Sequence, residues 1–154
     1  MKTVYVIDAC ALIDAAKEYK MSKKTFAPIW EALDELISNG QLITSSEIHD
    51  ELKDDDLITW AKTHKDFFVP LSKDIQEQVS IVLKKYPDLI KMKSTSNSNG
   101  DPFLVATAIT KNGCIVTNER PGSGNNGDVR IPNVCKGFDL TYMDLHAFLD
   151  LVIQ

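Results

Sequence analysis

The stretch Val4-Tyr5-Val6-Ile7-Asp8 indicates the fold class, because a short apolar run ends there directly at a carboxylate. A continuous run of this kind, rich in β-branched residues, is typical of a strand buried on both faces of a parallel sheet. Two further runs have the same character, Leu42-Ile43-Thr44 and Cys114-Ile115-Val116-Thr117. The sequence therefore predicts three buried strands, the first of which ends at Asp8.

Helical patterns separate these strands. We expect helices over residues 10–19, 28–38, 56–65, 73–86, 101–111 and 142–153. A further helix is expected after the second strand, capped by Ser45 and Ser46. Thr44 and Glu47 there have the spacing of a capping box. Residues 94–100 and 119–133 are predicted loops, and residues 67–69 a connector or edge strand. Strands that alternate with helices predict a three-layer α/β/α sandwich on a central, mainly parallel sheet, with residues 1–154 as a single domain.

The composition is that of an ordinary globular chain, with 44% hydrophobic and 25% charged residues. No apolar run approaches the ~18 residues that span a bilayer, and the first residues lack a signal-peptide cleavage site. We therefore expect no membrane attachment and a cytoplasmic location. Cys10, Cys114 and Cys135 lack the spacing of a disulfide framework or a zinc site. The net charge of −5 does not favour the binding of nucleic acid. Local groups of Lys and Arg nevertheless leave nucleic acid open as a partner.

Carboxylates occur at the ends of the predicted strands, where ligands bind in open parallel sheets. Asp8 ends the first strand, Glu51 follows the second by about two helical turns, and Glu119 follows the third. Asp101 begins the helix that leads into the third strand. Such oxygen ligands suit Mg²⁺ or Mn²⁺, whereas carboxylates packed without a cation would repel one another. We predict that these four side chains bind Mg²⁺ or Mn²⁺ at one edge of the sheet.

Each carboxylate taken alone also has a structural interpretation. Asp8 fits the cap of the helix that follows it, and Asp101, before Pro102, has the sequence of a helix N-cap. Glu51 competes with Glu47, and we favour Glu51 because it lies beside the apolar face of its helix. Glu119 alone is only an acidic loop residue, so the prediction depends on the combination.

Four segments follow one another in the order of a known motif set. They are Val6–Cys10 with Leu12-Ile13, Ile48–Leu52, Asp101–Ala108 and Ile115–Glu119. This order resembles that of PIN domains, which include the VapC-like toxins of bacterial toxin–antitoxin operons. Within that group, three segments resemble a PIN-like branch of formally unknown function, namely Phe26–Trp30, Val116–Arg120 and Ile131–Lys136.

The resemblance implies a metal-dependent ribonuclease that cleaves single-stranded or structured RNA and that an antitoxin protein holds inactive. Asp8, Glu51 and Asp101 fall on metal-ligand positions of the family. Glu119 falls where many members have Asp, and its side chain is one methylene longer. Thr117 falls where a hydroxyl supports the site, with Asn118 beside it. Since dimers are usual in the family, a homodimer is a further expectation.

Two other functions stay open at this point. A phosphatase or phospho-acceptor domain would use Asp8 as the nucleophile, although dehalogenase-type phosphatases carry a second Asp where Cys10 stands here. A non-catalytic binding module would use the same acids only as helix caps. The sequence alone does not separate these functions from a nuclease.

No second constellation of catalytic residues stands out in the sequence. The spacing of His49, His64 and His146 does not suggest a triad, so we interpret them as surface or packing residues. Ser45, Ser46 and Cys10 lack a nucleophile-elbow motif and a histidine partner. We therefore interpret these three as helix-capping and packing residues.

Overall fold

A five-stranded sheet forms the centre of the protein in the computed structural model, which describes residues 2–90, 100–125 and 127–153. The strands are β1 (Tyr5–Ile7), β2 (Leu42–Ser45), β3 (Phe68–Val69), β4 (Cys114–Val116) and β5 (Tyr142–Met143), in the order β3-β2-β1-β4-β5. Every neighbouring pair is parallel, so all five carboxyl ends lie at the same edge. Val6 of β1 is in register with Ile43 on one side and Ile115 on the other.

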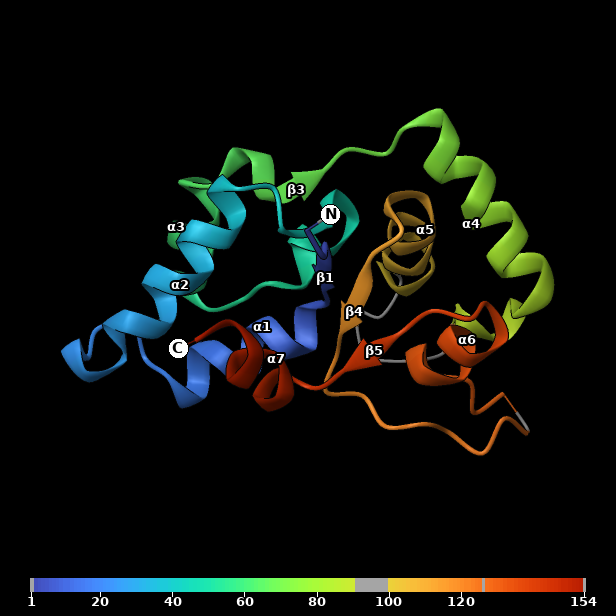
Figure 1. Ribbon diagram of the computed structural model, residues 1–154. Coiled ribbons are helices and arrows are strands. Elements are labelled where there is room, and N and C mark those ends of the chain that lie inside the picture. Colours follow the sequence, from blue (N-terminus) through green and yellow to red (C-terminus); the bar gives the residue numbers. More distant parts are fainter. Residues whose placement is uncertain (1, 91–99, 126, 154) are drawn as a thin grey trace.

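Helices cover both faces of this sheet (Figure 1). To one side of β1 lie α1 (Ala9–Glu18), α2 (Ala27–Ser38), α3 (Asp55–Lys62) and α7 (Leu145–Val152), and to the other lie α4 (Lys73–Lys85), α5 (Asp101–Lys111) and α6 (Ile131–Gly137). Short 3₁₀ helices connect them: η1 (Lys24–Phe26), η2 (Ser46–Glu51), η3 (Lys65–Phe67) and η4 (Pro87–Leu89). This arrangement confirms the predicted three-layer α/β/α sandwich. Among the described residues, no helix has the length and hydrophobicity that crossing a membrane requires.

The core lies on both faces of the central strands. Val6 and Ile7 of β1 and Ile115 of β4 have no exposed surface, as the continuous apolar runs predict. Leu104 and Val105 of α5 are equally buried against the sheet. The buried strands are therefore fixed in place, and the residues that directly follow them are positioned by the core.

Two segments near the C-terminus differ from the predictions. Residues 142–153 were expected to form one helix, but β5 comes first and α7 begins at Leu145, because Asp144 accepts the backbone N–H of Ala147 at 2.8 Å. The predicted loop over 119–133 is interrupted by α6, whose start is fixed by a hydrogen bond from the Arg130 N–H to the side chain of Asn133. The other predicted loop, 94–100, lies outside the described residues except for its last residue.

The segment after β2 also differs from the prediction, since it forms the 3₁₀ helix η2. Ser45 accepts the N–H of Glu47 at 3.1 Å, which confirms the predicted serine cap. Thr44 does not form the predicted capping box. Its hydroxyl instead donates to the carbonyl of Ile7 at 2.6 Å, because this part of β2 lies against the end of β1. One buried side chain thus joins the ends of the two strands.

We expect Thr44→Val to lower the free energy of unfolding by about 1–3 kcal/mol, since it keeps the shape but removes a buried donor. Urea denaturation measures this loss. Thr107→Val is the matched control, because Thr107 is also fully buried but donates to the Phe103 carbonyl within the same helix. That carbonyl keeps its helical backbone partner, so the loss should be smaller. Equal losses would contradict a specific link between β1 and β2.

Candidate active site

Asp8 follows the last residue of β1 and is only 4% exposed. Its backbone N–H donates to the Val116 carbonyl at 3.0 Å, which holds it between the ends of β1 and β4. Its Oδ1 accepts the N–H of Ala11 at 2.9 Å and so caps α1. The capping interpretation is therefore right for this residue, but it uses only one of the two carboxylate oxygens.

The other contacts of the Asp8 carboxylate come from two side-chain donors. The Thr117 hydroxyl donates to Oδ2. The Cys10 thiol lies 3.1 Å from Oδ1 and 3.2 Å from Oδ2. Burial raises the pKa of Asp8, while these hydrogen bonds act to lower it. Burial also raises the pKa of the Cys10 thiol, which keeps it a donor. Sequence reasoning missed this role of Cys10.

Glu51, the last residue of η2, belongs to the same electrostatic group. Its Oε2 is buried and makes no hydrogen bond within the described part of the chain. Burial, together with the charges of Asp8 and Glu119, raises the pKa of Glu51 to about 7. Asp8 and Glu119 therefore both lie close enough to Glu51 to disfavour its ionised form, and we treat the three carboxylates as one group.

Gly100 gives the Glu51 carboxylate room at the start of α5. A Cβ atom on Gly100 would lie 2.6 Å from Oε2 of Glu51 and 3.0 Å from Cγ2 of Ile48. The φ angle of Gly100 is −78°, so space, and not an unusual backbone conformation, requires glycine here. Gly100 also occupies the N-cap position, and Asp101 is the first helical residue. The N-cap interpretation of Asp101 is therefore wrong, and Asp101 directly follows the glycine that contacts Glu51.

Thr117, Asn118 and Glu119 form the turn that leaves β4. The N–H of Glu119 donates to the Thr117 hydroxyl at 3.1 Å, so one hydroxyl joins this backbone to the Asp8 carboxylate. The Asn118 side chain donates to Asp14 at 2.7 Å and accepts the N–H of Leu145 at 2.9 Å. Asn118 thus positions the turn between α1 and α7.

The donor chemistry of this group suits a divalent cation. Electrostatic coupling joins Glu51 to Asp8 and to Glu119, and Asp101 begins α5 directly after Gly100. In residues 2–90, 100–125 and 127–153, no three Asp, Glu, His or Cys side chains already stand close enough to enclose a metal ion. Mg²⁺ does not need such an enclosure, since it usually takes one or two carboxylates and keeps several waters. The buried, unsatisfied oxygen of Glu51 is a ligand of the right kind.

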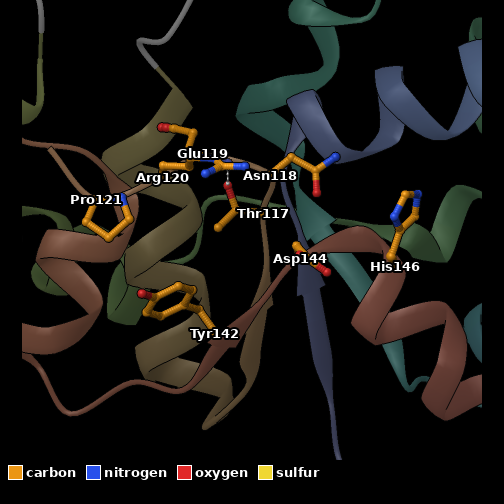
Figure 2. Close-up of a pocket in the computed structure, with 8 residues that line it drawn as sticks. All are labelled: Thr117, Asn118, Glu119, Arg120, Pro121, Tyr142, Asp144 and His146. Carbon is orange, nitrogen blue, oxygen red and sulfur yellow. Dashed lines mark hydrogen bonds between the residues drawn. The ribbon is translucent and has the colours of Figure 1, made fainter.

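A cavity of about 590 Å³ opens beside the carboxylates (Figure 2). It is lined by Thr117, Asn118, Glu119, Arg120, Pro121, Tyr142, Asp144 and His146. Through Thr117 and Glu119 it shares a wall with the carboxylate group. Its volume falls within the ~300–1,000 Å³ that is usual for ligand sites. Sequence reasoning missed Arg120 and Tyr142, because Tyr142 reaches this place only when β5 pairs with β4.

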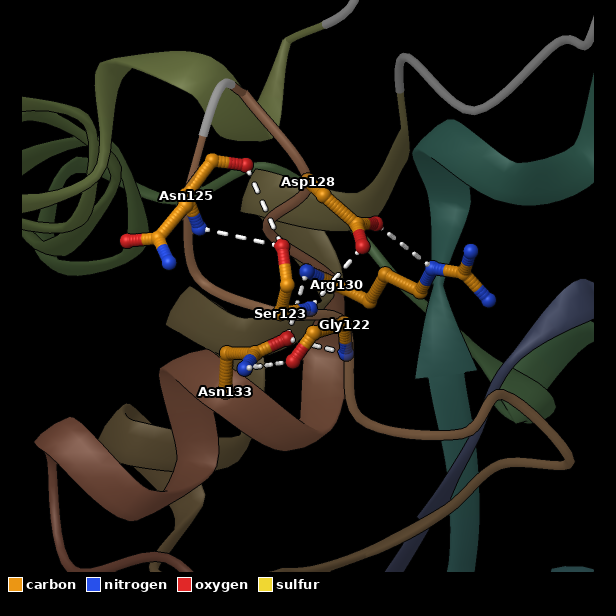
Figure 3. A network of polar contacts seen from close by, with 6 residues as sticks. All are labelled: Gly122, Ser123, Asn125, Asp128, Arg130 and Asn133. Carbon is orange, nitrogen blue, oxygen red and sulfur yellow. Dashed lines mark hydrogen bonds and ion pairs between the residues drawn. The ribbon is translucent and has the colours of Figure 1, made fainter.

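The loop after this turn is closed by Asn133 (Figure 3). The Asn133 Oδ1 accepts the N–H groups of Gly122 at 2.8 Å and Arg130 at 3.0 Å, and its Nδ2 donates to the Gly122 carbonyl at 3.0 Å. Arg130 also pairs with Asp128 at 3.1 Å. The loop is therefore tied together at its base, which fixes the chain that follows Glu119 at the wall of the cavity.

A family model described as a domain of unknown function (DUF4411) matches residues 5–152. The chain belongs to this family. The match includes all five strands and all four carboxylates, and it agrees with the resemblance to a PIN-like branch of unknown function. No curated protein is similar enough in sequence to count as a match to this DUF4411 chain.

Two solved structures share the fold of this DUF4411 domain. One is VapBC2 from Rickettsia felis bound to a DNA fragment from their promoter, with a TM-score of 0.50, 15% identity, and coverage of 92% of this chain and 98% of that chain. The other is VapBC-1 from nontypeable Haemophilus influenzae, with a TM-score of 0.52, 16% identity, and coverage of 94% and 99%. At such identities the likeness concerns the fold, and it confirms the predicted PIN-like sandwich.

We expect Glu51→Gln to raise the melting temperature of the metal-free protein at pH 8 by roughly 2–4 °C. The pKa of Glu51 is about 7 in the folded chain against an ordinary 4.5. A raised carboxylate pKa means that stability falls as the pH rises from 4.5 through 7, since ionisation then opposes folding. Glutamine stays neutral, so the two proteins should differ at pH 8 and melt at similar temperatures well below pH 4.5.

Thermal melting in EDTA at several pH values measures this effect. Glu47→Gln is the control, because Glu47 is exposed in the same 3₁₀ helix. Its melting temperature should follow that of the wild type at every pH. A gain for Glu51→Gln of the same size at all pH values would contradict the electrostatic coupling.

Proposed function

We propose that this chain is a ribonuclease dependent on Mg²⁺ or Mn²⁺, and the toxin of a toxin–antitoxin pair. The observation that carries the proposal is the coupled group of Asp8, Glu51 and Glu119, with a buried Glu51 oxygen that has no hydrogen-bond partner among the described residues. The group lies at the carboxyl ends of parallel strands, where ligands bind in such sheets. Perturbed carboxylates beside an open cavity are typical of functional sites.

In this proposal, Asp8, Glu51, Asp101 and Glu119 hold the metal ion directly or through water. The ion, when bound, acidifies a water molecule and stabilises the charge on the phosphate. The rest of the chain positions these ligands. Thr117 and Cys10 orient the Asp8 carboxylate, and Gly100 leaves space for Glu51. Asn118 fixes the turn that carries Glu119.

The two alternative functions fit the contacts less well. A dehalogenase-type phosphatase needs a second carboxylate two residues after its nucleophile, but Cys10 stands there, with its thiol 3.1 Å from Oδ1 of Asp8. A non-catalytic module explains Asp8 as a helix cap. It does not explain why Glu51, a half-buried residue, places one carboxylate oxygen out of contact with solvent beside two like charges. These contacts favour the metal-dependent nuclease.

The proposed partners follow from the fold and from the chemistry of the site. Both similar structures are of VapBC, one of them with promoter DNA, which supports an antitoxin protein as the partner of this chain. We propose single-stranded or structured RNA as the substrate, action in the cytoplasm as one domain over residues 1–154, and a homodimer. The net charge of −5 includes the four carboxylates, whose charge a bound cation would offset.

Asp8→Asn is expected to lower RNA cleavage by at least about 100-fold, beyond the 10–100-fold typical of groups that only support a metal ligand. The measurement is cleavage of a labelled single-stranded RNA with Mg²⁺ or Mn²⁺, with and without EDTA. Asp66→Asn, at an exposed carboxylate in η3, is the control and should keep full activity. If EDTA and Asp8→Asn both leave cleavage unchanged, the proposed function is wrong.

Gly100→Ala tests the position of Glu51 without changing any charge. The added methyl group would lie 2.6 Å from Oε2, so the carboxylate must move. We expect cleavage and Mn²⁺ affinity to fall about tenfold. The metal-free melting temperature should fall as well, because the methyl group also approaches buried Ile48 and the backbone carbonyl of Glu47, so each protein is compared with its own metal-free value. The rise in melting temperature on adding Mn²⁺ reports the affinity. An unchanged Mn²⁺ response would exclude Glu51 as a ligand placed by this contact.

A further inference from the structure

We propose that the cavity beside the carboxylates binds one unpaired nucleotide, with its base on the ring of Tyr142 and its phosphate on the guanidinium of Arg120. This inference rests on the proposed function, since it assigns part of the substrate to a defined place. The cavity, at about 590 Å³, is large enough for a group of this size. It begins at Thr117 and Glu119, beside the proposed metal ligands, and extends to β5 and the start of α7 (Figure 2).

Tyr142 is an exposed aromatic residue on the edge strand β5, which pairs with β4. The residue is 42% exposed. The other large hydrophobic residues exposed in the described part of the chain, Ile81 and Leu151, are aliphatic and lie outside the cavity. The backbone of Tyr142 is held in register with Ile115 of β4. Bases stack on such rings with little regard for sequence. An exposed ring on a fixed strand therefore suits an unstacked base.

Arg120 supplies the positive charge of the cavity. The chain has two arginines, and Arg130 is paired with Asp128 at 3.1 Å. Arg120 is exposed and forms no ion pair within the described part of the chain. Guanidinium groups match phosphate in both charge and geometry. Since Arg120 directly follows Glu119, a phosphate bound there would adjoin the carboxylate group.

The other polar walls of the cavity have partners within the protein. The Asn118 side chain donates a hydrogen bond to Asp14 and accepts one from the N–H of Leu145. Asp144 caps α7, and His146 lies 2.9 Å from Glu18. These contacts fix the shape of the cavity and leave Tyr142 and Arg120 to recognise a ligand. A base can reach the ring only when it is unpaired, which favours a single strand over a duplex.

The first test is the affinity for a labelled single-stranded RNA oligonucleotide, measured by fluorescence anisotropy at low salt in EDTA so that no metal-dependent cleavage occurs. Tyr142→Ala should weaken binding roughly tenfold, while Tyr142→Phe, which keeps the ring, should bind nearly as the wild type does. Leu151→Ala removes an exposed apolar side chain outside the cavity and should have no effect. Equal affinities for Tyr142→Ala and Leu151→Ala would overturn the inference.

Arg120→Gln gives the second test through the salt dependence of binding. Loss of one phosphate contact should lower the slope of log affinity against log salt by about 0.7, the value for a single strand. A merely structural role would not change this slope. Arg130→Gln is the matched control and should leave the slope unchanged, because that arginine is already paired. Equal slopes for the two variants would contradict a phosphate contact at Arg120.

The inference and the proposed function fail in different ways. If the wild type cleaves RNA but Tyr142→Ala and Arg120→Gln bind it normally, the nuclease stands and the nucleotide site is wrong. If the wild type binds RNA through these residues but does not cleave it with Mn²⁺, the nucleotide site stands and the nuclease is wrong. A DNA oligonucleotide of the same sequence that binds equally well supports recognition through base and phosphate. Failure of the wild type to bind either strand overturns the inference.

Discussion

The burial of the Asp8 carboxylate between the ends of β1 and β4 is the constraint on which the rest of the site depends. A buried carboxylate needs donors, and the fold supplies them from both sides of the chain, through Thr117 after β4 and through Cys10 and Ala11 in α1. These donors fix the direction of the carboxylate. They also fix the turn after β4, since the Thr117 hydroxyl accepts the N–H of Glu119. One buried charge therefore sets the positions of two further site residues.

The grouping of carboxylates opposes folding unless a cation is present. Burial and the charges of Asp8 and Glu119 all raise the pKa of Glu51, so its ionised form is disfavoured in the folded chain. The core compensates for this cost, because Val6, Ile7 and Ile115 are completely buried around the same strand ends. In the proposed function, a bound divalent cation would offset this repulsion. Ionisation of Glu51 lowers the stability of the metal-free fold, and this cost is our main physical argument for proposing a metal-dependent function.

Sequence patterns predicted the strands that are buried on both faces, because such strands are continuous apolar runs. The apolar runs of β1, β2 and β4 identified the buried strands, and their ends identified Asp8 and Glu119 as neighbours in space. The two-residue strand β5 was missed, because an edge strand this short is defined by its pairing with β4 and not by its own composition. For the same reason, the sequence alone did not indicate that Tyr142 lines the cavity. Cys10 was interpreted as packing, since nothing in its neighbours shows that its thiol meets Asp8.

The acidic character of the chain gives the cavity its significance. The net charge of −5 gives the protein no overall attraction for a polyanion. The proposed recognition of RNA therefore relies on a few defined contacts beside the carboxylates, and stacking on an aromatic ring does not depend on net charge. Tyr142 supplies such a ring, and Arg120 a local cation whose position is fixed because Asn133 closes the loop that follows it. In this proposal the hydrogen bonds that the Asn133 side chain makes in that loop support the cavity wall, although none of them involves Asp8, Glu51 or Glu119.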